Sequence, residues 1–175
     1  MLCPTIHTDR LIIRRFMEAD IDMQYEILTD KRLSQYIKFP KLTKDEELEC
    51  IKKWIAVSDT SDNERWVIAL KGNDQPIGNI SVNGIDRKNN YCNVGYVVLY
   101  DYQNRGYASE ALKAVSDYLL KERNYRLVEC SCNENNKSSS RVMINAGFQK
   151  DGYIANRRKN PDGSYAGVEY YSKSL

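Results

Sequence analysis

A glycine-centred turn that leads directly into a helical pattern is the part of this sequence best suited to chemistry. The turn, residues 103–109, follows the apolar run 94–100 and precedes apolar residues spaced three and four apart. The first N–H groups of a helix have no partners within it, and the helix dipole adds positive potential there. Such a turn can hold a pyrophosphate through its main chain alone. We therefore interpret this segment as an anion-binding cradle: Gln103, Asn104, Arg105, Gly106, Tyr107, Ala108 and Ser109.

Three other short motifs accompany the cradle in a fixed order along the chain. They are Gly95-Tyr96 before it, and Asn136-Lys137-Ser138-Ser139 and Ala146-Gly147-Phe148 after it. Together with the spacing Gln103-x-x-Gly106-x-Ala108, they resemble the GCN5-related N-acetyltransferases, and most closely the RimJ/RimL-type branch, which acetylates protein N-termini. The resemblance covers most of the chain, from Thr8-Asp9-Arg10-Leu11 to the last predicted strand. One such glycine motif is weak support, but four motifs in family order are strong support.

The resemblance implies an α+β fold and a cofactor. The fold would be a mixed, mostly antiparallel sheet of six to seven strands, flanked by about four helices, with the two central strands splayed apart. Acetyl-CoA would place its pyrophosphate on the cradle and its pantetheine arm along the exposed edge of the first central strand, with an N–H there near the thioester carbonyl. Besides residues 103–109, the implied cofactor contacts are Val97, Val98, Leu99, Asn136 and Ser139.

Ser139 is the residue that the resemblance implies as proton donor to the departing thiolate. It lies three residues after Asn136, so capping of the helix by Asn136 is an alternative role for this pair. The tyrosine that other branches use as proton donor would fall at Met143, whose side chain cannot donate a proton. We expect Ser139 or an ordered water to take this role.

The sequence does not supply an obvious general base. Many relatives carry a glutamate just before the Gly-Tyr pair, but this chain has Asn93 there, and an amide does not accept a proton at neutral pH. Glu110, Glu129 and His7 are candidates by chemistry, although each is more typical of a surface position. An α-amine, with a pKa of about 7.8, needs little help to lose its proton, unlike a lysine at about 10.4.

The elements that must position these residues follow from periodicity and turn signals. A first strand, 11–16, precedes helices over 18–28 and 44–57, the second of which opens with the capping-box pair Thr43 and Glu46. Strands over 65–70, 76–82 and 91–99 then lead to the cradle helix, a strand over 126–132 parallel to its neighbour, and a second helix after Asn136. Strands over 148–155 and 165–172 form a final hairpin, with loop 29–42 and this hairpin bordering the acceptor site.

Composition and charge narrow the function classes. A chain of 175 residues with 42% hydrophobic residues suits a single domain over 1–175, and a net charge of +2 gives no reason to expect nucleic acid or a membrane as partner. The five cysteines do not form a disulfide framework, and Cys130 and Cys132 read as buried small side chains, so we expect no metal site. The N-terminus lacks a secretory pattern, which favours a cytoplasmic protein.

The favoured function is acetyl transfer from acetyl-CoA to a primary amine by direct attack in a ternary complex, with a protein or peptide N-terminus as acceptor. A small-molecule amine (a polyamine, amino acid or antibiotic) and a non-catalytic CoA-binding sensor are alternatives. A nucleotide-binding protein is disfavoured because no G-x-x-x-x-G-K-[ST] string is present. The terminal segment with Tyr165, Tyr170 and Tyr171 could close the sheet or join a homodimer.

Overall fold

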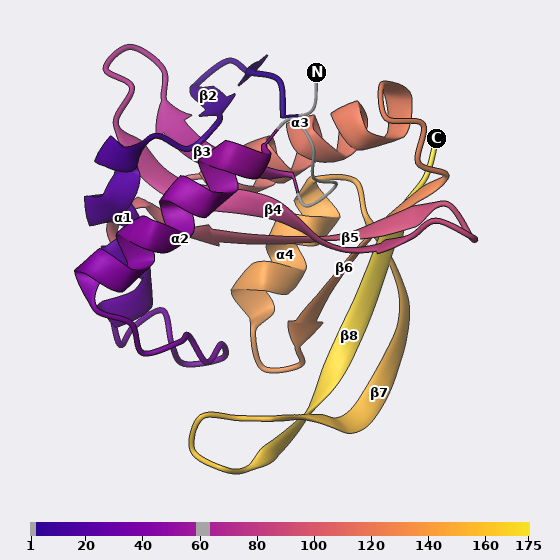
Figure 1. The fold of residues 1–175 in the computed structure, drawn as a ribbon. Helices are drawn as coiled ribbons and strands as arrows, with labels where there is room; N and C mark the ends of the chain where they lie inside the picture. Colours follow the sequence, from indigo (N-terminus) through magenta and orange to yellow (C-terminus); the bar gives the residue numbers. More distant parts are fainter. Residues whose placement is uncertain (1–2, 59–63) are drawn as a thin grey trace.

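The described residues form one mixed sheet of eight strands (Figure 1), in the order β1-β2-β3-β4-β5-β6-β8-β7. A computed structural model of the protein describes residues 3–58 and 64–175. The strands are β1 (Ile6–His7), β2 (Leu11–Arg14), β3 (Arg65–Leu70), β4 (Pro76–Asp86), β5 (Tyr91–Val98), β6 (Leu127–Asn133), β7 (Gln149–Lys159) and β8 (Tyr165–Lys173). The helices are α1 (Ile21–Thr29), α2 (Lys44–Val57), α3 (Tyr107–Lys121) and α4 (Lys137–Asn145), with short 3₁₀ turns η1 (Glu18–Asp20) and η2 (Tyr100–Tyr102).

The predicted α+β architecture is confirmed, and the sheet has one strand more than the upper estimate of seven. The additional strand is β1, whose two residues pair with β2. So short a segment carries no periodicity by which the sequence could reveal it. The first predicted helix is divided into η1 and α1, while α2 and β3 have the predicted bounds.

Local capping explains why α2 begins where it does. The Thr43 hydroxyl accepts a hydrogen bond from the Glu46 N–H (3.3 Å), and the Glu46 carboxylate accepts one from the Thr43 N–H (2.7 Å). This reciprocal pair satisfies two backbone donors that the first helical turn leaves without partners. The capping box expected from the sequence is therefore present.

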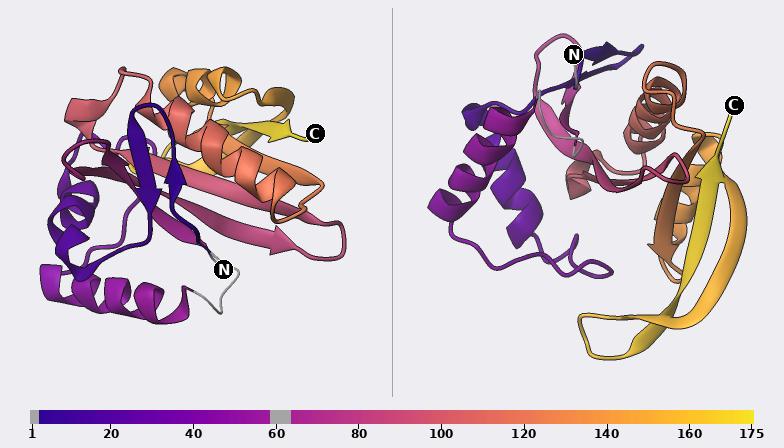
Figure 2. Two further views of the ribbon diagram at one scale, coloured as in Figure 1. Left: turned by 90° about the horizontal axis from the view of Figure 1, so that it is seen from above. Right: turned by 45° about the vertical axis from the view of Figure 1, so that its right-hand side comes forward.

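Two apolar cores lie on opposite faces of the sheet, and Figure 2 shows α1 and α2 on one side and α3 on the other. The core on the α3 and α4 face includes Leu112, Val115 and Met143, packed against strand residues such as Val94 and Val98. The core on the other face joins Met23, Ile27 and Ile51 to strand residues Val67, Ala69 and Leu99. Val97 of β5 also packs against this second core, so alternate residues of β5 face opposite sides of the sheet.

The central strands β5 and β6 separate along their length, as the family resemblance implies. They pair in parallel only from Tyr91 to Asn93 on β5 and from Leu127 to Glu129 on β6. Beyond this point β5 continues to pair with β4 as far as Val98, and β6 pairs with β8. The second half of β5 therefore presents an unpaired backbone edge to a gap between the two strands.

The C-terminal strand closes the sheet. β8 lies between β6 and β7, and Tyr171 is buried against α4, where its hydroxyl and that of Ser140 are 2.6 Å apart. The hairpin of β7 and β8 extends well beyond the rest of the molecule (Figure 1), and Tyr165 near its tip is exposed. The terminal segment was expected either to close the sheet or to join a homodimer, and β8 closes the sheet.

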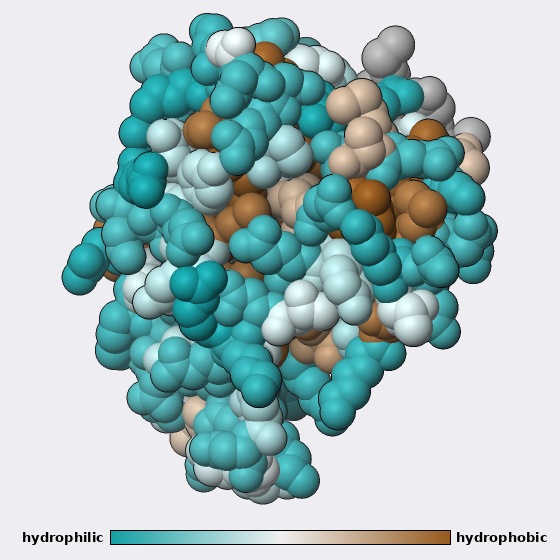
Figure 3. Space-filling view, turned by 90° about the vertical axis from the view of Figure 1, so that its left-hand side faces the viewer, coloured by the Kyte–Doolittle hydropathy of each residue, from teal (hydrophilic) through white to brown (hydrophobic). Residues whose placement is uncertain are grey.

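The outer surface over α1 and α2 is mostly hydrophilic, with apolar residues in scattered patches (Figure 3). Among the described residues, none of the helices combines the length and the apolar character that crossing a bilayer requires.

Candidate active site

The cradle is a run of main-chain donors at the start of α3. Among the described residues, the N–H groups of residues 104–109 have no acceptor, and the first hydrogen bond of the helix runs from the Glu110 N–H to the Gly106 carbonyl (3.1 Å). Asn104 (φ +60°) and Gly106 (φ +81°) both have left-handed backbones, which turn successive N–H groups toward one side. This is the arrangement that an anionic group such as a pyrophosphate requires.

Arg10 and Glu110 hold the cradle in place through hydrogen bonds. The Glu110 carboxylate accepts hydrogen bonds from the Thr8 hydroxyl (2.6 Å), the Arg10 N–H (2.9 Å) and Arg10 Nε (2.6 Å). Arg10 Nη1 in turn donates to the Arg105 carbonyl (2.9 Å), and its guanidinium lies 4.7 Å from the ring centroid of Tyr107. Burial alone would raise the pKa of Glu110, but these hydrogen bonds and the Arg10 charge lower it overall. Glu110 therefore has a structural role, and its ionised form is the one that the fold stabilises.

Glu110→Gln is expected to destabilise the protein by about 1–2 kcal/mol at pH 7, the cost of weakening charge-assisted hydrogen bonds at a partly buried site. Because folding lowers the pKa of Glu110, its contribution is present above the ordinary glutamate pKa of about 4.3 and is lost as the pH falls through the lower native value. Urea unfolding at pH 7 and at progressively lower pH measures both effects. Glu122→Gln, at an exposed position just after α3, is the control. Equal stability of wild type and Glu110→Gln at pH 7 would contradict this role.

The unpaired edge of β5 offers fewer free groups than the sequence suggests. The Leu99 N–H donates to the Ile77 carbonyl (2.8 Å) and the Leu99 carbonyl accepts from the Tyr102 N–H (2.9 Å), so both groups are engaged. Val97, two residues earlier, directs its main-chain groups toward β4. Val98 and Tyr96 direct theirs into the gap, where the Val98 carbonyl accepts a hydrogen bond from Gln103 Nε2 (3.0 Å). The Val98 N–H and both main-chain groups of Tyr96 are therefore the ones available to an arm lying in the gap.

Ser139 faces the gap from the first turn of α4. Its N–H donates to Asn136 Oδ1 (3.0 Å), so Asn136 caps the helix. Its hydroxyl lies 2.9 Å from the hydroxyl of Tyr96, which also lies 3.1 Å from the Ser139 carbonyl oxygen and donates to it. Burial raises the pKa of Tyr96 well above its usual range, so the phenol stays protonated. Met143 is fully buried in the core and does not reach this place.

The place of Tyr96 beside Ser139 was not predicted from the sequence. The Gly95-Tyr96 pair served there only as a family motif. Strand alternation, however, places Tyr96 on the same face as Val94 and Val98, toward α4 and Ser139. That signal could have placed its phenol beside Ser139.

A cavity of about 230 Å³ lies beside this pair of hydroxyls. Its wall on one side comes from the α1–α2 loop through Tyr36 and Phe39, as predicted for loop 29–42, and the final hairpin contributes Arg158. Arg158 is the one charged residue among those that line it: Tyr36, Ile37, Phe39, Asn79, Ser81, Asn83, Val94, Gly95, Tyr96, Val97, Ser131, Cys132, Asn133, Asn136, Ser139 and Arg158.

Gly95 allows the cavity floor to form. A Cβ atom at this position would lie 2.3 Å from Asn83 Nδ2, so a larger residue here would displace the Asn83 side chain from its place across β5. The Ser81 hydroxyl donates to Asn83 Oδ1 (2.8 Å) and holds it there. The glycine of the Gly-Tyr pair therefore leaves the space that the Asn83 side chain occupies beside the cavity.

The candidate bases named from the sequence lie elsewhere. Glu110 is engaged with Arg10, and His7 is exposed on β1 at the edge of the sheet. Glu129 pairs with Asn93 across the strands and does not line the cavity, and burial together with Asp151 raises its pKa. Within the described residues, the cavity lining includes neither a carboxylate nor a histidine.

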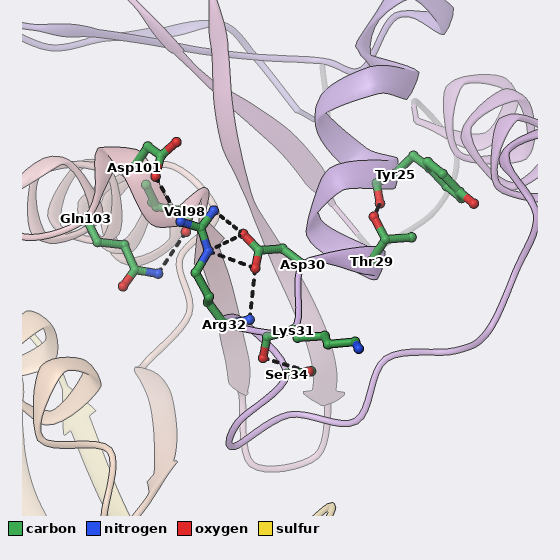
Figure 4. A network of polar contacts seen from close by, with 9 residues as sticks. All are labelled: Tyr25, Thr29, Asp30, Lys31, Arg32, Ser34, Val98, Asp101 and Gln103. Carbon is green, nitrogen blue, oxygen red and sulfur yellow. Dashed lines mark hydrogen bonds and ion pairs between the residues drawn. The ribbon is translucent and has the colours of Figure 1, made fainter.

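The α1–α2 loop is tied to the end of β5 by ionic contacts (Figure 4). Arg32 pairs with Asp30 (2.6 Å) and Asp101 (3.2 Å), and its guanidinium lies 4.2 Å from the ring centroid of Tyr100. Beside this cluster, Gln103 points toward Val98 (Figure 4). One arginine therefore connects the cavity loop to the turn that leads into the cradle.

The cysteines near the gap are packed side chains. Cys130 is buried and its thiol donates to the Val94 carbonyl (3.2 Å) where the strands separate, and burial raises the pKa of Cys132 to about 11. In the described ranges, no three His, Cys, Asp or Glu side chains are placed to hold a metal ion together.

Comparison with known proteins agrees with this geometry. The profile of the Acetyltransferase (GNAT) domain family matches residues 10–149. The chain is 32% identical to the uncharacterized N-acetyltransferase YnaD of Bacillus subtilis (strain 168), over 95% of this chain and 94% of that protein. Among solved structures, it is similar to a GNAT-family acetyltransferase from Bacillus anthracis (TM-score 0.83, 24% identity, 98% of each chain). It is also similar to RimL, a ribosomal L7/L12 alpha-N-protein acetyltransferase in complex with coenzyme A (TM-score 0.85, 19% identity, 100% of this chain and 98% of that one). The chain therefore belongs to the GNAT acetyltransferase family and is an acetyl-CoA-dependent acyltransferase.

Proposed function

We propose that this protein acetylates the N-terminal α-amine of a protein or peptide. The observation that carries the proposal is the uncharged lining of the cavity: apart from Arg158, its side chains are neutral, and no carboxylate among the described residues is there to take up a proton. An α-amine is substantially neutral near pH 7.4, whereas a lysine amine would need a strong base. The site suits an acceptor that arrives already deprotonated.

The size of the cavity supports the same choice of acceptor. At about 230 Å³ it is smaller than the roughly 300–1,000 Å³ typical of pockets that enclose a whole small ligand. It has room for a terminal residue whose chain continues outside. The structural similarity to RimL, whose name gives a ribosomal protein N-terminus as substrate, points in the same direction.

The residues present fit acetyl-CoA, which when bound supplies an acetyl group activated as a thioester. The unpartnered N–H groups of residues 104–109 match the charges of its diphosphate. The Val98 N–H and the main-chain groups of Tyr96 face the gap, where they can bind an amide-containing arm and the acyl oxygen. Gln103 shapes the end of this edge through its hydrogen bond to Val98.

Ser139 is the residue to which we assign the proton that the leaving thiol requires. Its hydroxyl shares a hydrogen bond with Tyr96, which is itself fixed by donating to the Ser139 carbonyl. With the phenol proton on the Ser139 carbonyl, the Ser139 hydroxyl donates to the phenol oxygen. When the Ser139 hydroxyl turns to donate its proton to the thiolate in the gap, the phenol can turn to donate to Ser139 Oγ and replace that proton. Asn136 supports the pair by capping α4.

Ser139→Ala is expected to lower kcat about a hundredfold, the lower end of the contribution typical of a positioned proton donor, while acetyl-CoA affinity changes by less than about twofold. Tyr96→Phe should have a smaller effect, and the double variant should lose less than the product of the two. Steady-state kinetics and calorimetric binding measure these changes. Ser138→Ala, an exposed neighbour on the same helix, is the control. An unchanged kcat for Ser139→Ala would leave Ser139 a packing role only.

Arg158 gives the acceptor site its charge preference. Because Arg158 is the one cation among the described residues of the lining, the site should favour peptides with an acidic side chain near the N-terminus over peptides with a basic one. Arg158→Gln is expected to raise the KM of the acidic peptide about fivefold, the effect of losing one exposed charge-assisted contact. Arg157→Gln, on the same strand but outside the lining, should leave it unchanged. Equal KM values for the two peptides with wild type would contradict this preference.

A thiol-release assay with acetyl-CoA tests the proposed function. The acceptors are short peptides with free N-terminal Ser, Ala or Met, the same peptides with blocked N-termini, spermidine and free amino acids. We expect turnover with the free peptides, and mass spectrometry should place one acetyl group on the N-terminal nitrogen. Preferred turnover of spermidine or an amino acid, or binding of CoA without turnover on any amine, would refute the proposal.

A further inference from the structure

We infer that Asn79 presents its side-chain carbonyl oxygen to the acceptor amine, and that two buried residues behind it, Gln24 and Glu47, fix that orientation. The inference rests on the proposed function, because it names the group that receives the acceptor nitrogen. Asn79 lies on β4 and lines the cavity, next to Val97 of β5 in the sheet register. Gln24 is on α1 and Glu47 on α2, so three separate elements contribute to the arrangement.

The three side chains form a continuous chain of hydrogen bonds. Asn79 Nδ2 donates to Gln24 Oε1 (2.9 Å), and Gln24 Nε2 donates to Glu47 Oε1 (2.9 Å). Gln24 is 6% exposed and Glu47 is 2% exposed, so water does not compete freely for these groups. Buried polar groups of this kind have to be paired, and here each pairs with the next.

The carboxylate at the end of the chain fixes its direction. An amide can be turned over to exchange its oxygen and nitrogen, but an ionised carboxylate only accepts hydrogen bonds. Turning Gln24 over would place its oxygen against the Glu47 carboxylate, and turning Asn79 over would place two amide oxygens together. Glu47 therefore sets the orientation of Gln24, which sets that of Asn79.

This orientation leaves Asn79 Oδ1 available on the cavity side. Among the described residues it has no hydrogen-bond partner, and every fully buried side-chain N or O atom in the same set has one, so this oxygen is accessible. A neutral amine that donates one N–H to it keeps its lone pair free for attack on an acyl carbon. Asn79 Oδ1 would thus orient the attacking amine by accepting a hydrogen bond from it, without removing a proton.

Glu47 acts through orientation and not as a base. Two amide groups separate it from the cavity, and a neutral amide does not pass on a proton at neutral pH. Burial raises the pKa of Glu47, against the opposing effects of the Gln24 hydrogen bond and the Arg65 charge. Its neutral form retains a carbonyl oxygen that can accept from Gln24, so protonation does not by itself reverse the chain. Gln24 and Glu47 are therefore positioning residues.

The test compares substitutions in the hydrogen-bonded series Asn79, Gln24 and Glu47 by the acetyl-transfer assay. The amine substrate is a short peptide that begins with Ser, or spermidine if that is the amine that the wild-type enzyme acetylates. Asn79→Leu keeps the approximate shape but removes the oxygen, and should raise the acceptor KM about tenfold with the acetyl-CoA KM unchanged. Glu47→Gln allows the Gln24 and Asn79 amides to take either orientation and should raise the acceptor KM about threefold. Glu49→Gln, an exposed residue of the same helix, should have no effect.

Coupling distinguishes orientation from general stability. In the double variant Asn79→Leu/Glu47→Gln, the second substitution should add nothing to the acceptor KM, since it acts only through Asn79. If Glu47→Gln does not fold, as thermal unfolding would show, Gln24→Met takes its place in the same cycle. An unchanged acceptor KM in Asn79→Leu, or independent effects in the double variant, would overturn the inference. Failure of the proposed function would give a different result: the wild-type enzyme itself would acetylate no peptide N-terminus.

Discussion

Gly106→Val is expected to weaken acetyl-CoA binding about a hundredfold while the fold is retained, an effect of about 3 kcal/mol. Gly106 has φ +81°, a conformation that a β-branched residue adopts only with strain of about 1–3 kcal/mol. A Cβ atom there would also lie 3.2 Å from Arg10 Nη2, the side chain that holds the cradle. Relief of this strain turns the N–H groups away from their common focus, so two or more charge-assisted hydrogen bonds weaken together.

Isothermal titration with acetyl-CoA measures this loss, and thermal unfolding shows whether the protein remains folded. Gly163→Val is the matched control, because Gly163 has φ +92° in the β7–β8 turn with no heavy atom within 4 Å of a new Cβ. The Gly163→Val substitution introduces similar backbone strain, but in the β7–β8 turn and not in the cradle. The two variants should lose comparable stability, but only Gly106→Val should lose affinity. Wild-type affinity in Gly106→Val would remove the cradle from the binding site.

Most of the fold could be predicted because its signals are local. The capping box at Thr43 and Glu46 marks the start of α2, and short apolar runs bounded by turn or polar residues mark β3 and β5. The parallel pairing of β5 with β6 follows from the helix that separates them in sequence. β1 escaped prediction because two residues have no period, and the family resemblance supplied the separation of the central strands, which no local pattern specifies.

The candidate site was predictable in its backbone and less so in its side chains. The cradle followed from one glycine turn before a helix, since the free N–H groups are a property of any such position. Which groups of β5 remain free depends on the ladder with β4, so Leu99 was named from the sequence although its N–H is engaged with Ile77. The hydrogen bonds from Asn79 to Gln24 and from Gln24 to Glu47 join residues that are 55 and 23 positions apart, so tertiary packing makes them and no sequence spacing predicts them.

An acceptor with an α-amine is expected to react several hundred times faster at pH 7.4 than one with a lysine ε-amine. At that pH an α-amine with a pKa of about 7.8 costs roughly 0.5 kcal/mol to deprotonate, and a lysine with a pKa of about 10.4 costs about 4 kcal/mol. With no carboxylate in the described cavity lining, the enzyme has no nearby group to offset the difference of about 3.5 kcal/mol. The acceptor's own pKa should therefore govern the rate.

The pH dependence tests this directly. For each acceptor, kcat/KM should rise about tenfold per pH unit below the pKa of that amine and level off above it, so the advantage of the α-amine should shrink as the pH increases toward 9. The measurement uses one peptide with a free N-terminus, one with a blocked N-terminus and a free lysine, and one whose α-amine has a lower pKa. If the midpoint moves with the acceptor, deprotonation precedes binding to the enzyme. A midpoint common to all three acceptors would instead require a titrating base on the protein, and the neutral cavity wall formed by Asn79, Ser81 and Asn83 could not be the whole acceptor site.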